Sequence, residues 1–258
     1  MKLAWRAFSL CKGGNLEEEN EDAVFPQLVN GSSMTVDNFC CAMADGATQS
    51  SFSRLWASLL VNESCQSQEN SLNLQQTIFL ARSKWKNALP DQNLPWPVAI
   101  KIKQGSFATL LWFKIWQKNG FSTNGSDSDA QGWTACSVGD TCVFQIAKGK
   151  FINSFPLTKA DQFNNSPDLV STNPVYGGSR LVCSKVSGQW NRGDHFLIAS
   201  DALAQWIING MERSDLTWPI ISMNLTSLMR FQTWIKALRR QSAIKNDDTS
   251  LICLTVDG

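Results

Sequence analysis

The sequence predicts an α+β fold in which antiparallel strands form a sandwich. Its apolar segments come in blocks of strand-like and helix-like character rather than in strict alternation. Several strand-like segments are rich in Val, Ile, Phe and Trp and have Gly or Asn at their ends, a pattern typical of hairpins. Such blocks favour an antiparallel sandwich over a doubly wound parallel sheet. No linker-like segment divides the chain, so we expect a single domain spanning residues 1–258.

Strand-like segments recur from the N-terminus to the end of the chain. They are residues 4–10, 22–26, 39–44, 106–116, 132–146, 179–186, 195–200 and 249–256. Residues 119–131, rich in Gly, Ser, Asn and Asp, predict a long hairpin loop between two of these strands. Residues 163–174 are expected to form an irregular surface loop.

Four other segments have the periodicity of helices. They are residues 50–65, 74–88, 202–211 and a longer region, 220–243. In the first of them Phe52, Trp56, Leu59 and Leu60 recur at helical spacing, so that one face of the helix is apolar.

The charge balance argues against a nucleic-acid partner. The formal net charge is +1, whereas binding to nucleic-acid phosphates requires a clustered basic surface. The densest basic cluster, Lys236, Arg239, Arg240 and Lys245, is expected to be a solvated helix face. No segment approaches the roughly 20 apolar residues of a membrane helix, and the first apolar run is too short for a signal peptide. We therefore expect a cytoplasmic protein without a membrane partner.

Cysteine and histidine chemistry is not indicated. No two of the eight cysteines form a Cys-x-x-Cys pair. Most lie in apolar, strand-like runs, so we expect buried thiols rather than disulfides or zinc ligands. The single histidine, His195, stands at the start of a predicted strand. Because a Ser-His or Cys-His pair would have to use this residue, catalysis is expected to depend on carboxylates instead.

Isolated acidic residues stand where apolar segments begin or end. They are Glu21, Asp22, Asp45, Asp201, Asp247 and Asp248, and a further acid, Asp140, lies in the middle of a strand-rich segment. Taken singly, an acid beside a strand is most often a turn or cap residue. Several carboxylates without histidine or cysteine nearby favour a hard cation such as Mg²⁺ or Mn²⁺. Two such ions can acidify a bridging water and stabilise an in-line displacement at phosphorus.

Six short motifs follow one another along the chain. They are Asn-Glu-Asp-Ala at 20–23, Ala-Asp-Gly at 44–46, Gly-Ser-Phe-Ala-Thr at 105–109, Val-Gly-Asp-Thr at 138–141, Asp-His-Phe-Leu-Ile-Ala-Ser-Asp at 194–201 and Asp-Asp-Thr-Ser at 247–250. Each motif is unspecific by itself. In this order they resemble the motifs of the PPM (type 2C) family of metal-dependent serine/threonine protein phosphatases, and the chain resembles a divergent, bacterial-like member.

The resemblance implies both a fold and a site. The fold would be a four-layer α-β-β-α sandwich of two antiparallel sheets flanked by helices. Two Mn²⁺ or Mg²⁺ ions would be bridged by Asp45, and the Gly46 carbonyl would bind one of them. Asp201 and Asp247 would hold the first ion. Glu21 or Asp22 would serve the second, as a ligand or through water. Asp45 and Asp22 would be the catalytic residues, and the substrate would be a phosphoprotein.

The sequence departs from the family at the position that grips the phosphate. Many members carry an arginine five residues before the Asp of the first motif, where this chain has Glu17. An acid there removes a bidentate phosphate contact and adds repulsion. Another cation would then have to take the role, and Arg6, Arg54 and Arg180 are the candidates.

Two further departures affect the metal site. The second motif continues as Ala47-Thr48-Gln49 instead of with two backbone-permissive glycines, so this loop must follow a different course. Gln205 stands where members that bind a third metal have an acid. We therefore expect no well-formed third metal site beside Asp140.

Two functions remain open at this point. The first is a metal-dependent phosphatase that hydrolyses phosphoserine or phosphothreonine in proteins with a metal-bridging water. The alternative is a catalytically weak module of the same fold that binds a protein partner or a phosphorylated ligand. The retained acids favour the first function, because a pure scaffold does not need so many carboxylates near one sheet edge. The altered residues at Glu17 and at 47–49 favour the second.

Overall fold

A computed structural model of the chain describes residues 1–27, 31–48, 50, 52–66, 71–89, 96–117, 131–164, 166–175, 181 and 183–257. Most of the hairpin loop predicted at 119–131 lies outside these residues, as do Gln49, Arg180 and the start of the strand predicted at 179–186.

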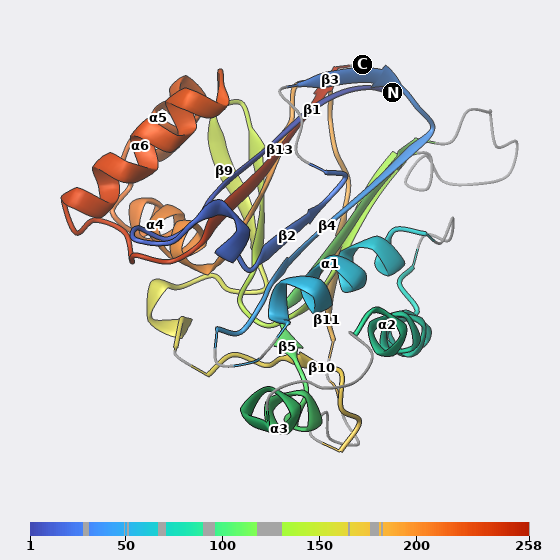
Figure 1. Cartoon of the computed structure of the whole chain (residues 1–258). Helices are drawn as coiled ribbons and strands as arrows, with labels where there is room; N and C mark the ends of the chain where they lie inside the picture. The colour runs from blue at the N-terminus through green and yellow to red at the C-terminus, as the bar shows by residue number, and fades with distance from the viewer. Residues whose placement is uncertain are drawn as a thin grey trace, which may run out of the picture.

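Two antiparallel sheets form the centre of the molecule (Figure 1). A six-stranded sheet has the order β3-β1-β13-β12-β8-β9, and a five-stranded sheet has the order β11-β7-β6-β4-β2. A small third sheet joins β10 and β5. The strands are β1 (Lys2–Leu10), β2 (Asp22–Phe25), β3 (Ser32–Thr35), β4 (Asn38–Asp45), β5 (Phe107–Ala108), β6 (Leu110–Gln117), β7 (Gln131–Val138), β8 (Cys142–Ala147), β9 (Lys150–Phe155), β10 (Val170–Ser171), β11 (Ser184–Gly188), β12 (His195–Ala199) and β13 (Thr249–Asp257).

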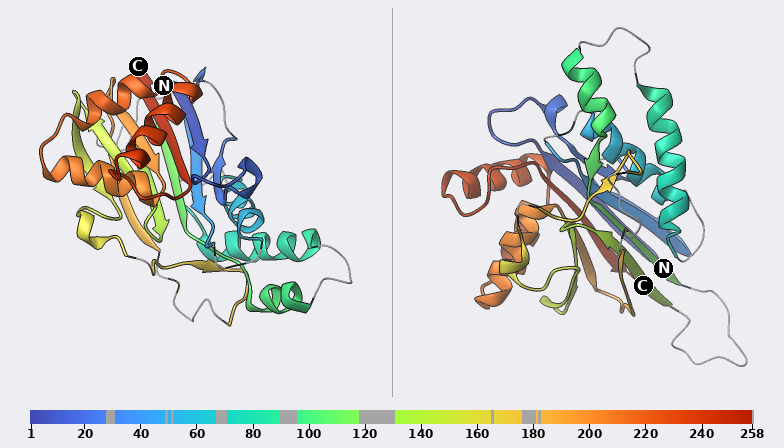
Figure 2. Two further views of the ribbon diagram at one scale, coloured as in Figure 1. Left: turned by 60° about the vertical axis from the view of Figure 1, so that its left-hand side comes forward. Right: turned by 90° about the horizontal axis from the view of Figure 1, so that it is seen from below.

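Helices cover the outer faces of the two large sheets (Figure 2). The helices are α1 (Ser53–Ser64), α2 (Leu74–Ala88), α3 (Trp96–Gln104), α4 (Asp201–Glu212), α5 (Thr217–Asn224) and α6 (Leu228–Arg240). Side chains of α1 and α2 pack with the five-stranded sheet. Those of α4, α5 and α6 pack with the six-stranded sheet. Two short 3₁₀ turns, η1 (Glu17–Glu19) and η3 (Ala160–Gln162), lie in the connections. The predicted four-layer sandwich is confirmed.

The alternation of side chains along the strands explains why the layers stack. In β1, the side chains of Leu3, Trp5 and Ala7 belong to the core between the sheets, whereas Phe8 and Leu10 belong to the core under α4 and α6. Successive side chains of a strand point to opposite faces, so an apolar strand supplies two cores at once. Strand β1 thus contributes side chains to the core on each side of its sheet.

Several predicted boundaries are wrong for local reasons. The strand predicted at 132–146 is two strands, because Gly139 adopts a positive φ of 100° in the turn between β7 and β8. The helix predicted at 220–243 is two helices, and the Ser227 side chain caps the second by accepting from the Arg230 amide. The segment 163–174 is not simply a surface loop, since Val170 is fully buried and its carbonyl accepts from the Trp56 indole (2.8 Å).

The expectation that all the cysteines are free thiols is wrong for one pair. Cys136 and Cys183 form a disulfide, with their Cα atoms 6.1 Å apart. Strand β11 pairs with β7, with Ser184 opposite Ser137, and this register brings the two cysteines together. Separately, none of the helices in the described ranges is long and apolar enough to cross a membrane.

Candidate active site

Acidic residues from distant parts of the chain meet at one end of the two sheets. Asp22 begins β2 and Asp45 ends β4, and the two are Cα partners across these strands of the five-stranded sheet. Asp201 follows β12 directly and begins α4, and Asp247 lies two residues before β13. Strands β12 and β13 are neighbours in the six-stranded sheet, with Ala199 opposite Leu251. Both sheets thus bring acids to the same end of the sandwich.

A cavity of about 750 Å³ collects most of these acids. Asp45, Asp140, Asp201 and Asp247 line it, together with Gly46 and with Thr109 at the β5–β6 junction. Two cationic side chains, Lys101 and Lys245, line the same cavity. The cavity therefore combines carboxylates from both sheets with ammonium groups, which is a suitable environment for an anionic ligand and for cations that neutralise the acids.

Main-chain and hydroxyl contacts fix the position of Asp45. Its amide donates to Oγ1 of Thr109 (2.9 Å), and the Thr109 amide donates to the Asp45 carbonyl (2.8 Å). The Thr109 hydroxyl also shares a hydrogen bond of 2.9 Å with Thr141 Oγ1. The motifs at 44–46, 105–109 and 138–141 are thereby joined in one buried network.

Gly46 has no room for a side chain. A Cβ atom at this position would lie 2.9 Å from the Ser53 Cβ and 3.0 Å from the Glu21 carbonyl oxygen. The Gly46 amide donates to this same oxygen (3.2 Å). The Asp-Gly pair is therefore explained by the close approach of α1 and of the segment before β2.

Burial is the main cause of the raised pKa values at this site. It raises the pKa of Asp45 well above the usual range, and the carboxylates of Asp22 and Asp201 raise it further. Burial likewise raises the pKa of Asp140 to about 7, with Asp201 as the next cause. Both shifts follow from burial and from neighbouring carboxylates, and a bound cation would offset them.

Asp22 is a buried acid of the site whose carboxyl oxygens are poorly satisfied. Both of its carboxyl oxygens are buried, and neither makes a well-formed hydrogen bond to a described residue. Burial raises its pKa well above the usual range, and the hydroxyls of Ser250 and Ser200 lie near enough to oppose this only in part. A buried acid without a partner is energetically costly unless it is protonated or meets a cation.

Glu21 and Asp248 have partners of their own. The Glu21 carboxylate accepts from the Ser53 hydroxyl. Asp248 is buried and accepts from the amides of Lys12 (2.7 Å) and Glu21 (2.8 Å). Asp248 therefore joins the segments that flank β1 and β2 to the start of β13. The sequence reasoning gave Asp248 no such role, although its place beside Asp247 in the last motif marked the segment.

Lys245 lies beyond α6 and is not part of a helix face, although its side chain is 53% exposed. Its ammonium lies 2.7 Å from Oδ2 of Asp247 and 3.3 Å from Oδ2 of Asp201. Arg239 is not on a solvated face either, because it donates to the carbonyls of Cys11 (2.7 Å) and Asp247 (2.6 Å). Of the predicted solvated basic cluster, Arg239 thus binds main-chain carbonyls, and Lys245, although exposed, contacts the acids of this site.

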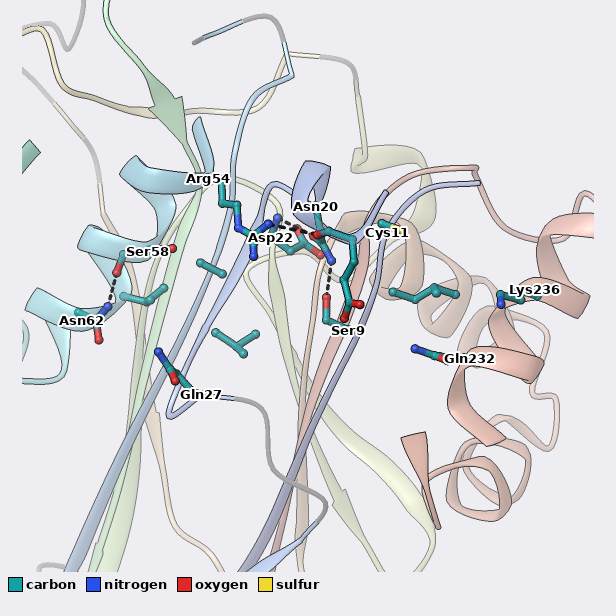
Figure 3. Close-up of a pocket in the computed structure, with 15 residues that line it drawn as sticks. Ser9, Cys11, Asn20, Asp22, Gln27, Arg54, Ser58, Asn62, Gln232 and Lys236 are labelled. Atoms are coloured by element: carbon teal, nitrogen blue, oxygen red, sulfur yellow. Dashed lines mark hydrogen bonds between the residues drawn. The ribbon is translucent and has the colours of Figure 1, made fainter. Parts of the chain in front are cut away.

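The residues expected to bind the substrate phosphate do not line the cavity around Asp45. Glu17 and Arg54 line a separate cavity of about 470 Å³ between α1 and α6, with Asp22 also in its wall (Figure 3). Arg54 donates there to the main-chain carbonyls of Glu17 (3.1 Å) and Glu18 (2.6 Å). Arg6 donates to the Leu225 carbonyl (2.6 Å). These contacts argue against each of them as a partner of a phosphate beside Asp45.

The donors suit a hard cation, although they are not yet gathered around one point. Oxygen ligands from several aspartates match Mg²⁺ or Mn²⁺, and a cation would stabilise the buried carboxyl oxygens of Asp22, which make no well-formed hydrogen bond to a described residue. Among the described side chains, however, no three Asp, Glu, His or Cys residues are grouped as a ready metal site. His195 lies apart, bonded to Thr255 Oγ1 (3.0 Å) and packed on Trp218.

Comparison with known proteins identifies the fold. No protein-family model matches the sequence, and no curated protein matches it. Among solved structures, the Mycobacterium tuberculosis serine/threonine phosphatase PstP/Ppp is similar with a TM-score of 0.56 at 12% identity, covering 100% of both chains.

Two further structures are similar over nearly the whole chain. One is the catalytic domain of serine/threonine protein phosphatase PstP in complex with two manganese ions, with a TM-score of 0.54, 12% identity and 100% coverage of both chains. Another is RsbX in complex with magnesium, with a TM-score of 0.51, 17% identity, and coverage of 98% of this chain and 94% of that one. The chain therefore has the fold of the PPM-type (PP2C) phosphatases, as its ordered motifs predict.

Proposed function

We propose that this chain is a metal-dependent phosphatase that hydrolyses phosphomonoesters on serine or threonine residues of proteins. The observation that carries the proposal is the cavity lined by Asp45, Asp201 and Asp247, which come from three distant parts of the chain. The shared fold supports it, because similar structures include phosphatases with bound manganese or magnesium.

In this proposal the metal-holding residues are those of the motifs. Asp45 would contact two ions, with the Gly46 carbonyl on one of them. Asp201 and Asp247 would hold the first ion, and Glu21 or Asp22 would serve the second. Divalent ions bound there would supply an acidified water and positive charge for the phosphoryl group.

The other residues of the site would hold this arrangement in place. The Thr109 hydroxyl and amide fix the main chain of Asp45, and the close contact of Gly46 with Ser53 fixes the turn after it. Asp22 would stabilise positive charge next to Asp45, since the two residues are direct cross-strand partners. The fixed carboxylates would therefore not have to rearrange during the reaction, which favours catalysis.

A second candidate function has its own support. The ammonium of Lys245 contacts both Asp201 and Asp247, so an ion pair within the protein already neutralises part of the acidic cluster. A module of this fold with weak or no catalysis could bind a phosphorylated ligand or a protein partner instead. It would bind a phosphopeptide without releasing phosphate.

One assay separates the two functions. Release of phosphate from p-nitrophenyl phosphate and from a phosphothreonine peptide would be measured with Mn²⁺, with Mg²⁺ and with EDTA. The phosphatase proposal expects release that requires the metal and disappears in Asp45→Asn. Binding of the peptide without release would favour the second function, and release that persists in EDTA would contradict the metal-dependent mechanism.

Three other sequence-based expectations stay predictions. They are the single domain over residues 1–258, the phosphoprotein substrate and the cytoplasmic location.

A further inference from the structure

Lys245 is placed where the two carboxylates of the proposed first metal position converge. It lies in the turn between α6 and β13, two residues before Asp247. Its ammonium contacts Oδ2 of Asp247 (2.7 Å) and Oδ2 of Asp201 (3.3 Å). One positive charge thus joins the start of α4 to the segment before β13.

In each carboxylate the main chain binds Oδ1, and Oδ2 is left for a cation. Oδ1 of Asp201 accepts from the Ala202 amide (2.6 Å), and Oδ1 of Asp247 accepts from the Asp248 amide (3.1 Å). The main chain therefore orients both carboxylates, and the remaining oxygen of each is directed at the Lys245 ammonium. This arrangement is a small cation position that the chain itself fills.

We propose that Lys245 is an exchangeable counter-ion: its ammonium holds Asp201 and Asp247 until a divalent cation takes these carboxylates, and it then binds the phosphoryl oxygens of the substrate in the same cavity. This inference rests on the proposed phosphatase function. A cation with two charges repels the ammonium and competes for the same two oxygens, so the two cannot occupy the position together.

Three observations on the cavity and its cations favour the substrate phosphoryl group as the second partner of Lys245. The side chain is 53% exposed, so the released ammonium can move within the cavity. The arginines Arg6 and Arg54 are held by main-chain carbonyls away from Asp45. The other cation lining the cavity, Lys101, makes no ion pair within the described part of the chain. Lys245 would thereby take the role of the arginine that Glu17 replaces.

The metal half of the inference is tested by calorimetry without any turnover. Mn²⁺ would be titrated into metal-free wild type, Lys245→Met, Lys245→Arg and Lys101→Met. The Lys245→Met variant should bind Mn²⁺ about threefold to tenfold more tightly than the wild type, because a competing, partly exposed ion pair is removed. Lys245→Arg keeps the charge and should bind Mn²⁺ like the wild type. Lys101→Met, which removes a charge from the same cavity but no ion pair, should stay within about twofold.

The phosphate half uses the same proteins saturated with Mn²⁺. Inorganic phosphate, the product of the proposed reaction, would be titrated into each. Loss of one charged hydrogen-bond partner should weaken phosphate binding by Lys245→Met about tenfold, and Lys245→Arg should restore most of it. If Lys101→Met instead carries the whole loss, Lys101 is the phosphate ligand and the inference is overturned.

The outcomes also separate this inference from the proposed function. If the wild type binds no Mn²⁺, both fall together. If the wild type binds Mn²⁺ and Lys245→Met binds it no more tightly, Lys245 is not a competitor and this inference alone is overturned. Tighter Mn²⁺ binding together with weaker phosphate binding in Lys245→Met, both reversed in Lys245→Arg, is the result that supports the exchange.

Discussion

Asp22 and Asp45 lie directly opposite each other on neighbouring antiparallel strands, and burial raises the pKa of both carboxyls well above their usual range. The Asp22 carboxylate raises the pKa of Asp45 further, because like charges at short distance disfavour ionisation. Two facing, buried acids stabilise neither strand pairing nor the core. Cations bound beside these two carboxylates would explain their placement, and the first prediction rests on this.

Asp45→Asn should lower Mn²⁺-dependent hydrolysis of p-nitrophenyl phosphate by at least about a hundredfold, because the charge that two cations would share is lost. The measurement is steady-state kinetics with and without Mn²⁺. His195→Ala is the control, since His195 begins β12 and does not line the acidic cavity. Activity that survives Asp45→Asn but not His195→Ala would point to histidine chemistry and against this site.

The metal-free protein should lose stability as the pH rises from about 4 to about 7. Burial raises the pKa of folded Asp140 from 3.8 to about 7, so in this window the folded state keeps a proton that the unfolded state releases. Unfolding is then favoured by rising pH. Thermal unfolding in EDTA should show a falling Tm, and Asp140→Asn should make the fall shallower.

The exposed Asp161 provides the control for this experiment. Asp161→Asn should leave the pH dependence of Tm in EDTA unchanged. Adding Mn²⁺ to the wild type should reduce the fall, because a bound cation stabilises the ionised acids. A Tm that is flat or rising over this range in EDTA would show that the acids are compensated by other means.

Regular alternation and motif order made most of the fold predictable. The apolar residues of β1 alternate between the two cores, and this pattern is local enough to be read in the sequence. The same holds for α2, whose predicted bounds match the observed Leu74–Ala88. The Asp-Gly pair at 45–46 was informative because it joins a carboxylate to a position without space for a Cβ atom.

The remaining features depend on contacts between distant segments. Nothing near Lys245 in the sequence indicates Asp201, its second ion-pair partner. Cys183 meets Cys136 only because β11 pairs with β7. The short strand β10 exists because Val170 and Ser171 pair with β5 under α1. Partners of this kind are fixed by tertiary structure, which overrides local preference.

Gly46→Ala should destabilise the protein by about 1–3 kcal/mol, the usual effect of an added methyl group in a packed site. The new Cβ would lie 2.9 Å from the Ser53 Cβ and 3.0 Å from the Glu21 carbonyl. Chemical denaturation measures the change. Gly13→Ala is the comparison, because its Cβ would meet the side-chain oxygen of Asn246 (3.1 Å), which can move. Equal losses in both variants would contradict the special role of Gly46.

Glu17→Arg should leave KM for p-nitrophenyl phosphate within about twofold of the wild-type value, since no contact with bound substrate is added. The sequence alone suggested the opposite, because the family arginine stands at this position. In the structure Glu17 begins η1 and lines the cavity between α1 and α6, beside Arg54 and not with Asp45. An arginine there would face the Arg54 guanidinium, and like charges repel.

Steady-state kinetics of Glu17→Arg beside Lys245→Met measures both positions at once. A tenfold fall in KM for Glu17→Arg alone would mean that the segment 17–19 moves to the phosphate when substrate binds. A rise in KM confined to Lys245→Met would place phosphate recognition at the turn before β13.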